Sequence, residues 1–118
     1  MKKIRMILLL GTMGGLITAC HFRRHTTIIE TGTNHYLRIE STGRVRFNQD
    51  ETGIAYISWG GYLKYTNDQK KLEAENDGHG GIRYELYDGD EKLDPFGNGR
   101  QFIAEAVRVM IRKGYHSN

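Results

Sequence analysis

The sequence contains a single cysteine, Cys20, which follows an apolar stretch near the start of the chain. Three basic residues, Lys2, Lys3 and Arg5, come first, and residues 6–17 follow without a charged side chain. A basic start followed by a short apolar segment is typical of a secretory signal peptide, which is removed from the mature protein. Because a lone cysteine has no partner for an internal disulfide, the exported domain must fold without covalent cross-links.

A transmembrane helix is the alternative interpretation of this apolar stretch. Such a helix needs roughly 20 apolar residues to cross about 30 Å of hydrocarbon. The uncharged stretch, residues 6–21, is shorter than that, and Gly11, Gly14 and Gly15 weaken it as a helix. Length and composition therefore favour a signal peptide.

The four residues that end the stretch, Ile17, Thr18, Ala19 and Cys20, make the prediction more specific. Their order of an aliphatic residue, two small residues and a cysteine resembles the lipobox of bacterial lipoproteins. This resemblance covers the leader alone. It implies that Cys20 receives a diacylglyceryl thioether and that a lipoprotein signal peptidase cleaves between Ala19 and Cys20. An ordinary secreted protein with an unmodified cysteine is the alternative.

A lipid on Cys20 would make the membrane the first partner of the mature protein. One acyl chain binds a bilayer only marginally, whereas two or three hold a protein durably. The leader then comprises residues 1–19, and residues 20–25 are the lipidated cysteine and a short tether. We expect a cell-envelope location, with the domain facing the periplasm or the exterior. A small basic cluster in the tether lies either beside anionic headgroups or in solvent: His21, Arg23, Arg24 and His25.

The net charge of the mature chain argues against a nucleic-acid partner. The whole sequence has 17 basic and 14 acidic residues. Removal of residues 1–19 takes away three of the basic residues and no acidic one, so the two signs then balance. Nucleic-acid binding needs a clustered positive surface, which this composition does not predict.

Apolar and polar side chains alternate with a period of two between residues 26 and 93. Successive side chains of a strand point to opposite faces, so each such segment predicts a half-buried β-strand. The predicted strands are residues 26–30, 36–40, 44–47, 54–59, 61–66, 71–75 and 82–87. The turn signals between them are short, which permits hairpins but not the crossovers that parallel strands need.

The period becomes helical over residues 98–113, where Phe102, Ile103, Ala106, Val107 and Met110 fall on one face. Asn98 or Asp94 is expected to cap the start of this helix, and Gly114 to adopt the left-handed conformation after its end. We predict a mainly β (α+β) fold for residues 26–118, a single domain. It comprises an antiparallel β-meander of about seven or eight strands, with one C-terminal amphipathic helix packed on its apolar face. A helix that binds a partner is the alternative.

The other face of the predicted sheet is charged. Its residues are Arg38, Glu40, Arg44, Arg46, Lys64, Lys71, Glu73, Glu75, Arg83 and Glu85. This face is either the solvated side of a one-sided sheet or a surface for a charged ligand. In the second case, the candidate binding surface consists of Trp59, Tyr62, Arg38, Arg46 and Arg83.

The most distinctive internal stretch is ISWGGYLKY, residues 57–65. Gly60 and Gly61 permit a tight turn or bulge between two strands. Trp59 beside them either lines the rim of a ligand pocket or closes one end of the β-core. The stretch resembles the S-x-GGYL segment of small, uncharacterised exported domains of bacterial envelope proteins, in which strands also precede a C-terminal helix. That resemblance implies the fold and carries no catalytic assignment.

Other candidate motifs fail on their context. A phosphate-binding loop needs a helix after it, whereas a predicted strand follows NDGHGG at residues 76–81. Asp88, Asp90 and Asp94 resemble a calcium loop, but Lys92 stands where an oxygen ligand is needed. The histidines lack the spacing of zinc ligands. We therefore expect no metal, no cofactor and no catalytic residue.

These observations predict a lipid-anchored lipoprotein of the cell envelope. Its β-domain would be a non-enzymatic binding or structural module that engages another envelope component through a sheet edge or the charged face. The alternatives are a β-barrel-like carrier of a small or lipidic ligand, which requires a cavity of roughly 300 Å³ or more, and a hydrolase whose carboxylates no motif marks. The sequence does not define the oligomeric state.

Overall fold

The computed structural model describes residues 25–115 of the chain. Its elements in chain order are β1 (His25–Gly32), β2 (His35–Thr42), β3 (Val45–Phe47), β4 (Ile54–Ile57), β5 (Tyr62–Asn67), β6 (Lys70–Asn76), β7 (Ile82–Asp88), β8 (Glu91–Leu93) and α1 (Arg100–Arg112). The predicted leader, with Ala19 and Cys20, lies outside the described residues. Within residues 25–115, no helix has the length and apolar character needed to cross a bilayer.

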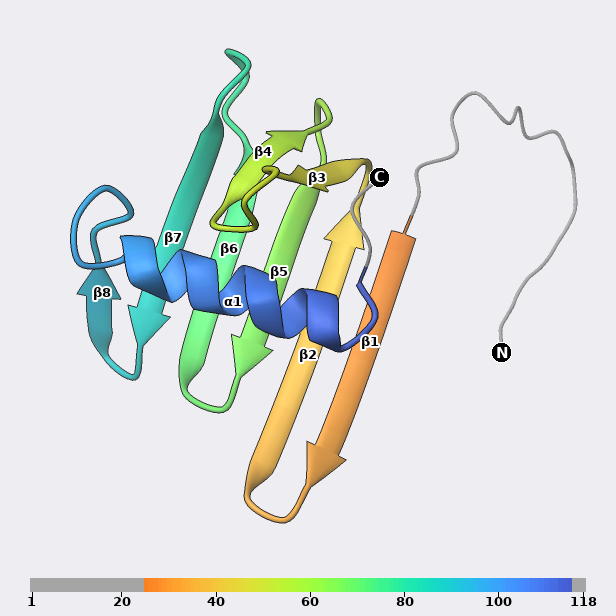
Figure 1. The fold of residues 1–118 in the computed structure, drawn as a ribbon, viewed down its shortest axis with the longest axis vertical. Helices are drawn as coiled ribbons and strands as arrows, with labels where there is room; N and C mark the ends of the chain where they lie inside the picture. The colour runs from red at the N-terminus through yellow and green to blue at the C-terminus, as the bar shows by residue number, and fades with distance from the viewer. Residues whose placement is uncertain (1–24, 116–118) are drawn as a thin grey trace, which may run out of the picture.

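Six of the strands form one antiparallel sheet in the order β1-β2-β5-β6-β7-β8 (Figure 1). Consecutive strands of this sheet pair as hairpins, except that β2 pairs with β5 after the chain has passed through β3 and β4. The helix α1 crosses one face of this sheet, which confirms the predicted meander with a C-terminal helix. One continuous apolar core lies between the sheet and the elements that cover it.

The strands β3 and β4 differ from the prediction, because they leave the large sheet and form a two-stranded sheet of their own. Gly43, immediately after β2, has a φ of 86°, a left-handed conformation that glycine adopts without a steric penalty. A side chain there would collide with the Ser58 hydroxyl, 2.5 Å from the position of a Cβ. This turn directs β3 away from the line of β2, so the β3–β4 hairpin lies on the helix side of the sheet (Figure 1).

The hairpin is needed because one helix cannot cover the apolar face of six strands. Helix α1 runs across the strands, so its length spans the width of the sheet (Figure 1). A helix with its side chains is only about 10 Å across, whereas the eight residues of β2 extend over roughly 26 Å. The hairpin fills the remaining area with four buried side chains: Val45, Phe47, Ile54 and Ile57. It is held to the sheet by hydrogen bonds from the Ile54 amide to the Tyr84 hydroxyl, 3.2 Å, and from the Asn76 amide side chain to the Ile57 carbonyl, 2.7 Å.

The apolar face of α1 is buried as predicted, but its N-terminus is built differently. Gly99 occupies the N-cap position and no side chain caps the helix. Asn98 accepts a hydrogen bond from the Asp94 amide, and Asp94 accepts one from the Phe96 amide, so both proposed caps stabilise the preceding loop instead. A Cβ on Gly99 would lie 2.5 Å from Leu86 Cδ1 and 2.7 Å from the Asp94 carbonyl, so only glycine fits. The proposed capping role of Asn98 or Asp94 is therefore wrong.

The C-terminus of α1 ends as the sequence predicts. Gly114 has a φ of 97°, and its amide donates to the Ile111 carbonyl at 3.1 Å while the Tyr115 amide donates to the Met110 carbonyl at 3.0 Å. These two bonds form a Schellman motif, which satisfies carbonyls that the helix leaves open. The motif turns the Tyr115 side chain back into the core, where its ring lies 5.7 Å from that of Phe47.

The end of α1 is also fastened to the edge strand β1. The Lys113 ammonium lies 3.0 Å from the Glu30 carboxylate, and this hydrogen bond lowers the pKa of the carboxyl group. Glu30 pairs with Leu37 in the sheet and therefore points toward the helix side. An inward-pointing charge on an edge strand hinders the addition of further strands, so Glu30 protects this long edge.

Tyr115 joins the helix end to the sheet through a buried hydrogen bond. Its hydroxyl donates to the Ser41 hydroxyl at 2.9 Å, and both residues are 2% exposed. We predict that Tyr115→Phe lowers the free energy of unfolding by about 1–2 kcal/mol, because a buried hydroxyl loses its partner. Urea unfolding of Tyr115→Phe and Ser41→Ala, separately and combined, measures this coupling, with Tyr87→Phe on the opposite sheet face as the control. Strict additivity of the two substitutions would show that the hydrogen bond contributes nothing.

Candidate interaction surfaces

The five residues of the predicted binding surface lie in two regions, three on the large sheet and two on or next to the β3–β4 hairpin. Arg38, Tyr62 and Arg83 are on the face of the large sheet that points away from the helix. Arg46 is on the β3–β4 hairpin, on the helix side. Trp59 lies in the turn between β4 and β5, at one end of the sheet. The prediction that Arg46 belongs to the charged face of the large sheet is therefore wrong, because β3 is not a strand of that sheet, and the same holds for Arg44.

The face of the large sheet opposite the helix, which we call the open face, is covered by no element of the described chain (Figure 1). Register places Glu40, Lys64, Glu73 and Glu85 side by side across four strands. The Tyr62 hydroxyl lies 3.4 Å from the Glu40 carboxylate, and the Lys64 ammonium lies 5.3 Å from the centre of the Tyr62 ring. These contacts hold an aromatic ring between charges of both signs.

Two arginines complete the open face with ion pairs. The Arg38 guanidinium lies 3.4 Å from Glu40, and the Arg83 guanidinium lies 3.2 Å from Glu75. Both arginine side chains are exposed by about half, and exposed pairs of this kind contribute at most about 1 kcal/mol to stability. A shallow depression of about 330 Å³ lies beside them. Its lining residues are Tyr62, Leu63, Lys64, Glu73, Ala74, Glu75, Arg83 and Glu85.

Two carboxylates of the open face stand in facing positions. Glu73 and Glu85 stand directly opposite each other on β6 and β7. Like charges in facing positions destabilise a sheet, but three cations surround this pair on the same face. Lys64 stands opposite Glu73, and Lys71 and Arg83 occupy the diagonal positions.

The exposed side of the β3–β4 hairpin carries arginine and tyrosine side chains. The Arg46 guanidinium lies 5.1 Å from the centre of the Tyr56 ring, in the geometry of a cation–π contact. Arg44 precedes β3. Its amide donates a hydrogen bond to the Ser58 hydroxyl across the hairpin, and its carbonyl accepts one from the Ser58 amide. Sequence alternation indicated that Arg44 and Arg46 share a face, but nothing in it revealed that this face belongs to a separate hairpin.

Trp59 lies in a tight turn that confirms the prediction from Gly60 and Gly61. The Gly61 amide donates to the Ser58 carbonyl at 2.8 Å, and Gly60 has a φ of 76°. A Cβ on Gly61 would lie 2.7 Å from the Thr42 carbonyl, so the turn packs closely against the end of β2. The Trp59 side chain is 76% exposed. It therefore does not close the end of the β-core.

A second hollow lies on the helix side, between α1 and the sheet. It measures about 280 Å³ and opens to solvent. It is lined by Tyr65, Asn67, Lys70, Phe102, Glu105, Ala106, Arg108, Val109 and Arg112. Burial raises the pKa of the Tyr65 hydroxyl, to which the Asn67 side-chain amide donates a hydrogen bond. No sequence pattern pointed to this groove, because it forms where a helix crosses strands that are distant in the chain.

The loop between β6 and β7 is built as a hairpin loop. Asp77 accepts hydrogen bonds from the amides of His79, 2.7 Å, and Gly81, 3.0 Å, which lower the pKa of its carboxyl group. These two loop amides therefore already donate to the Asp77 carboxylate and are not directed at a bound phosphate. Within residues 25–115, no cluster of three or more His, Cys, Asp or Glu side chains could hold a metal ion.

Comparison with known proteins adds no relative from which a function could be transferred. No protein family, no curated protein and no solved structure matches the chain.

Proposed function

We propose that this chain is a lipid-anchored lipoprotein of a bacterial cell envelope. Its leader is removed after Ala19, and acyl chains on Cys20 hold the mature protein to a membrane on its periplasmic or exterior side. The β-domain is a non-enzymatic binding or structural module that engages another envelope component. The membrane and one envelope protein are its partners.

The observation that carries this proposal is the order of elements at the start of the chain. A basic segment, an apolar segment and a lipobox-like sequence precede the only cysteine. The first strand begins at His25, five residues after Cys20, and the apolar core is built from residues 28–115. Within the described residues this core is continuous. A self-contained domain directly behind an anchoring site is the arrangement that a lipoprotein requires.

The open face is the surface that we assign to the envelope partner. Its arginines are exposed, and its carboxylates Glu73 and Glu85 stand side by side among cations on a face that no described element covers. Charged groups arranged in this way select a partner and steer its approach. By contrast, a carrier needs a cavity enclosed by strands. Here the sheet is open, and the hollows of about 330 and 280 Å³ both open to solvent instead of being enclosed by strands, so the geometry favours the binding module.

Charge reversal on the open face tests the partner surface. The lipidated full-length protein, cross-linked in intact cells, should give an adduct with one envelope protein. We expect the double variant Arg38→Glu, Arg83→Glu to reduce its yield about tenfold, which corresponds to roughly 1.4 kcal/mol of binding free energy. Arg108→Glu, on the exposed side of α1, is the matched control and should leave the yield unchanged. Equal yields from all three proteins would exclude the open face.

A further inference from the structure

The chain enters the domain at the same end of the sheet where Trp59 is exposed. His25, the first residue of β1, pairs with Thr42 at the end of β2, and Thr42 pairs with Tyr62 at the start of β5. Because adjacent strands lie about 4.8 Å apart, His25 and Tyr62 are roughly 10 Å apart. Trp59 precedes Tyr62 by three residues. We call this the anchor end of the sheet.

The tether is too short to hold the anchor end far from a membrane. Five peptide bonds separate Cys20 from His25. An extended chain spans at most about 3.6 Å per residue, so His25 can lie no more than roughly 18 Å from the lipidated residue. The anchor end, and with it Trp59, therefore lies within reach of the bilayer surface.

The anchor end presents a basic and aromatic surface. The exposed residues are Trp59 in the turn, Arg44 at the start of the hairpin, and the stacked pair Arg46 and Tyr56 beside them. We call these four residues the anchor-end patch. Asp77, in the β6–β7 loop, adds one negative charge at this end, against the two arginines of the patch.

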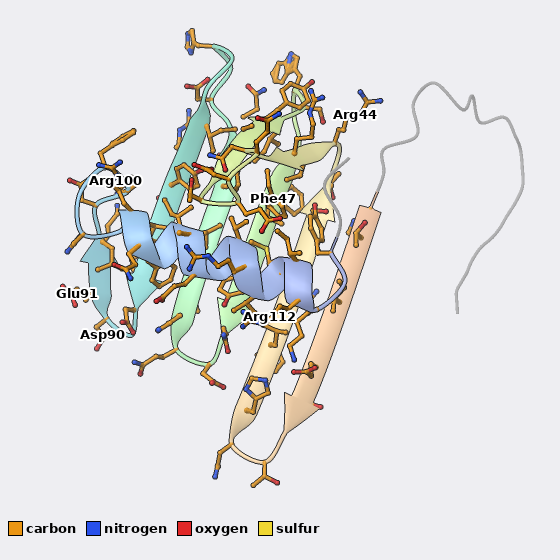
Figure 2. All side chains as sticks on the ribbon, viewed as in Figure 1. Arg44, Phe47, Asp90, Glu91, Arg100 and Arg112 are labelled. Carbon is orange, nitrogen blue, oxygen red and sulfur yellow. The ribbon has the colours of Figure 1, made fainter. Side chains whose placement is uncertain are left out.

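The opposite end of the sheet is acidic. It is formed by the β5–β6 and β7–β8 turns, where Asp68, Asp88, Asp90 and Glu91 outnumber Lys70 and Lys92. Figure 2 shows Arg44 at one end of the domain and Asp90 and Glu91 at the other. A negatively charged membrane surface attracts the first end and repels the second. The charge distribution thus favours the same orientation as the tether.

Hydrogen bonds also fix the backbone of the Trp59 turn next to Arg44. The Ser58 hydroxyl accepts a hydrogen bond from the Arg44 amide at 2.8 Å, and the Ser58 amide donates to the Arg44 carbonyl at 2.9 Å. The Gly61 amide closes the turn on the Ser58 carbonyl. The ring and the Arg44 side chain are therefore presented together.

From these observations we infer that the anchor-end patch docks on the headgroup region of an anionic bilayer. This inference rests on the proposed lipid anchor. Tryptophan is enriched at membrane interfaces because its amphipathic ring suits the headgroup level, and arginine binds lipid phosphate groups through paired hydrogen bonds. The domain then stands with its strands along the membrane normal, and the open face remains accessible from the side.

Trp59 is the only tryptophan in the chain, so its fluorescence reports on this site without any substitution. The lipidated protein is reconstituted into vesicles of phosphatidylethanolamine and phosphatidylglycerol, and into vesicles of phosphatidylcholine alone. In the anionic vesicles we expect the emission to shift to shorter wavelength and to be quenched by brominated acyl chains. In phosphatidylcholine vesicles, and in the double variant Arg44→Glu, Arg46→Glu, we expect the shift and the quenching to be lost. Lys70→Glu at the acidic end should behave as the wild type.

The same sample separates failure of this inference from failure of the proposed function. Its intact mass shows whether Cys20 carries acyl chains. A lipidated protein whose Trp59 emits as in water, and is still quenched by iodide in anionic vesicles, would overturn the docking inference alone. A protein from envelope membranes that carries no lipid on Cys20 would overturn the proposed function and the inference with it.

Discussion

Replacing Cys20 by alanine should abolish fatty-acid incorporation into the protein and leave the leader attached. The reason is chemical, since the thioether needs a sulfur and the chain has no second cysteine to supply one. Two or three acyl chains hold a protein to a bilayer durably, each buried CH₂ contributing about 0.8 kcal/mol, and all of this is lost together. Labelling of cells with a fatty-acid analogue, followed by gel electrophoresis of the purified protein, measures the effect.

The control for this experiment is Lys70→Ala, which lies fifty residues after Cys20 in the sequence and at the acidic end of the sheet. It should incorporate label at the wild-type level. Salt washing of the membrane fraction adds a second readout, because an acyl anchor withstands high salt whereas electrostatic adsorption does not. A Cys20→Ala protein that is labelled as strongly as the wild type would exclude this residue as the acylation site.

The second large effect concerns the helix as the cover of the sheet. Phe102→Asp should abolish cooperative unfolding of the domain. Truncating a buried phenylalanine costs about 3–5 kcal/mol, and an unpaired buried carboxylate costs several more. Since domains of this kind are stable by only about 5–15 kcal/mol, little or no native state should remain. Circular dichroism during thermal unfolding measures the loss of the transition.

Phe96→Asp is the matched control, because it introduces the same change six residues earlier. Phe96 is 82% exposed in the loop before α1, whereas Phe102 is 9% exposed. The control should unfold within about 0.5 kcal/mol of the wild type, as exposed substitutions usually do. A Phe102→Asp protein that melts like this control would mean that α1 does not seal the core.

The meander and its helix were predictable because their signals are local. Leu37 and Ile39 alternate with Arg38 and Glu40, and in the structure the first two are buried while the others lie on the open face. Short polar turns forced neighbouring strands to pair as hairpins. The helical period placed Phe102 and its companions on one face, and Gly114 ended the helix as expected.

The structure differs from the prediction where contacts between residues distant in the sequence determine the position of an element. Residues 44–47 alternate as any strand of the sheet would, so periodicity alone could not show that β3 leaves it. The cause is the left-handed turn at Gly43 together with the uncovered area beside a single helix. The core residue Tyr115 lies beyond the helical pattern, and it enters the core only through the Schellman motif. The only sequence signal for its burial was that an aromatic residue directly follows Gly114, the glycine that ends the helix.

The candidate surface was predicted less well than the fold. Arg38, Tyr62 and Arg83 do share the open face, because a common parity within paired strands was enough to place them. The position of Trp59 at the anchor end depends on strand direction and loop geometry, which no local pattern contains. Its relation to the tether becomes visible only when the sheet order is known.

The most direct measurement is the intact mass of the wild-type protein extracted from envelope membranes. We expect a chain that begins at Cys20 and bears a diacylglyceryl group, with or without a third acyl chain on the new amine, and fragmentation should place the added mass on its first residue. A chain that retains its first nineteen residues, with an unmodified thiol, would contradict the anchor on which the proposed function depends.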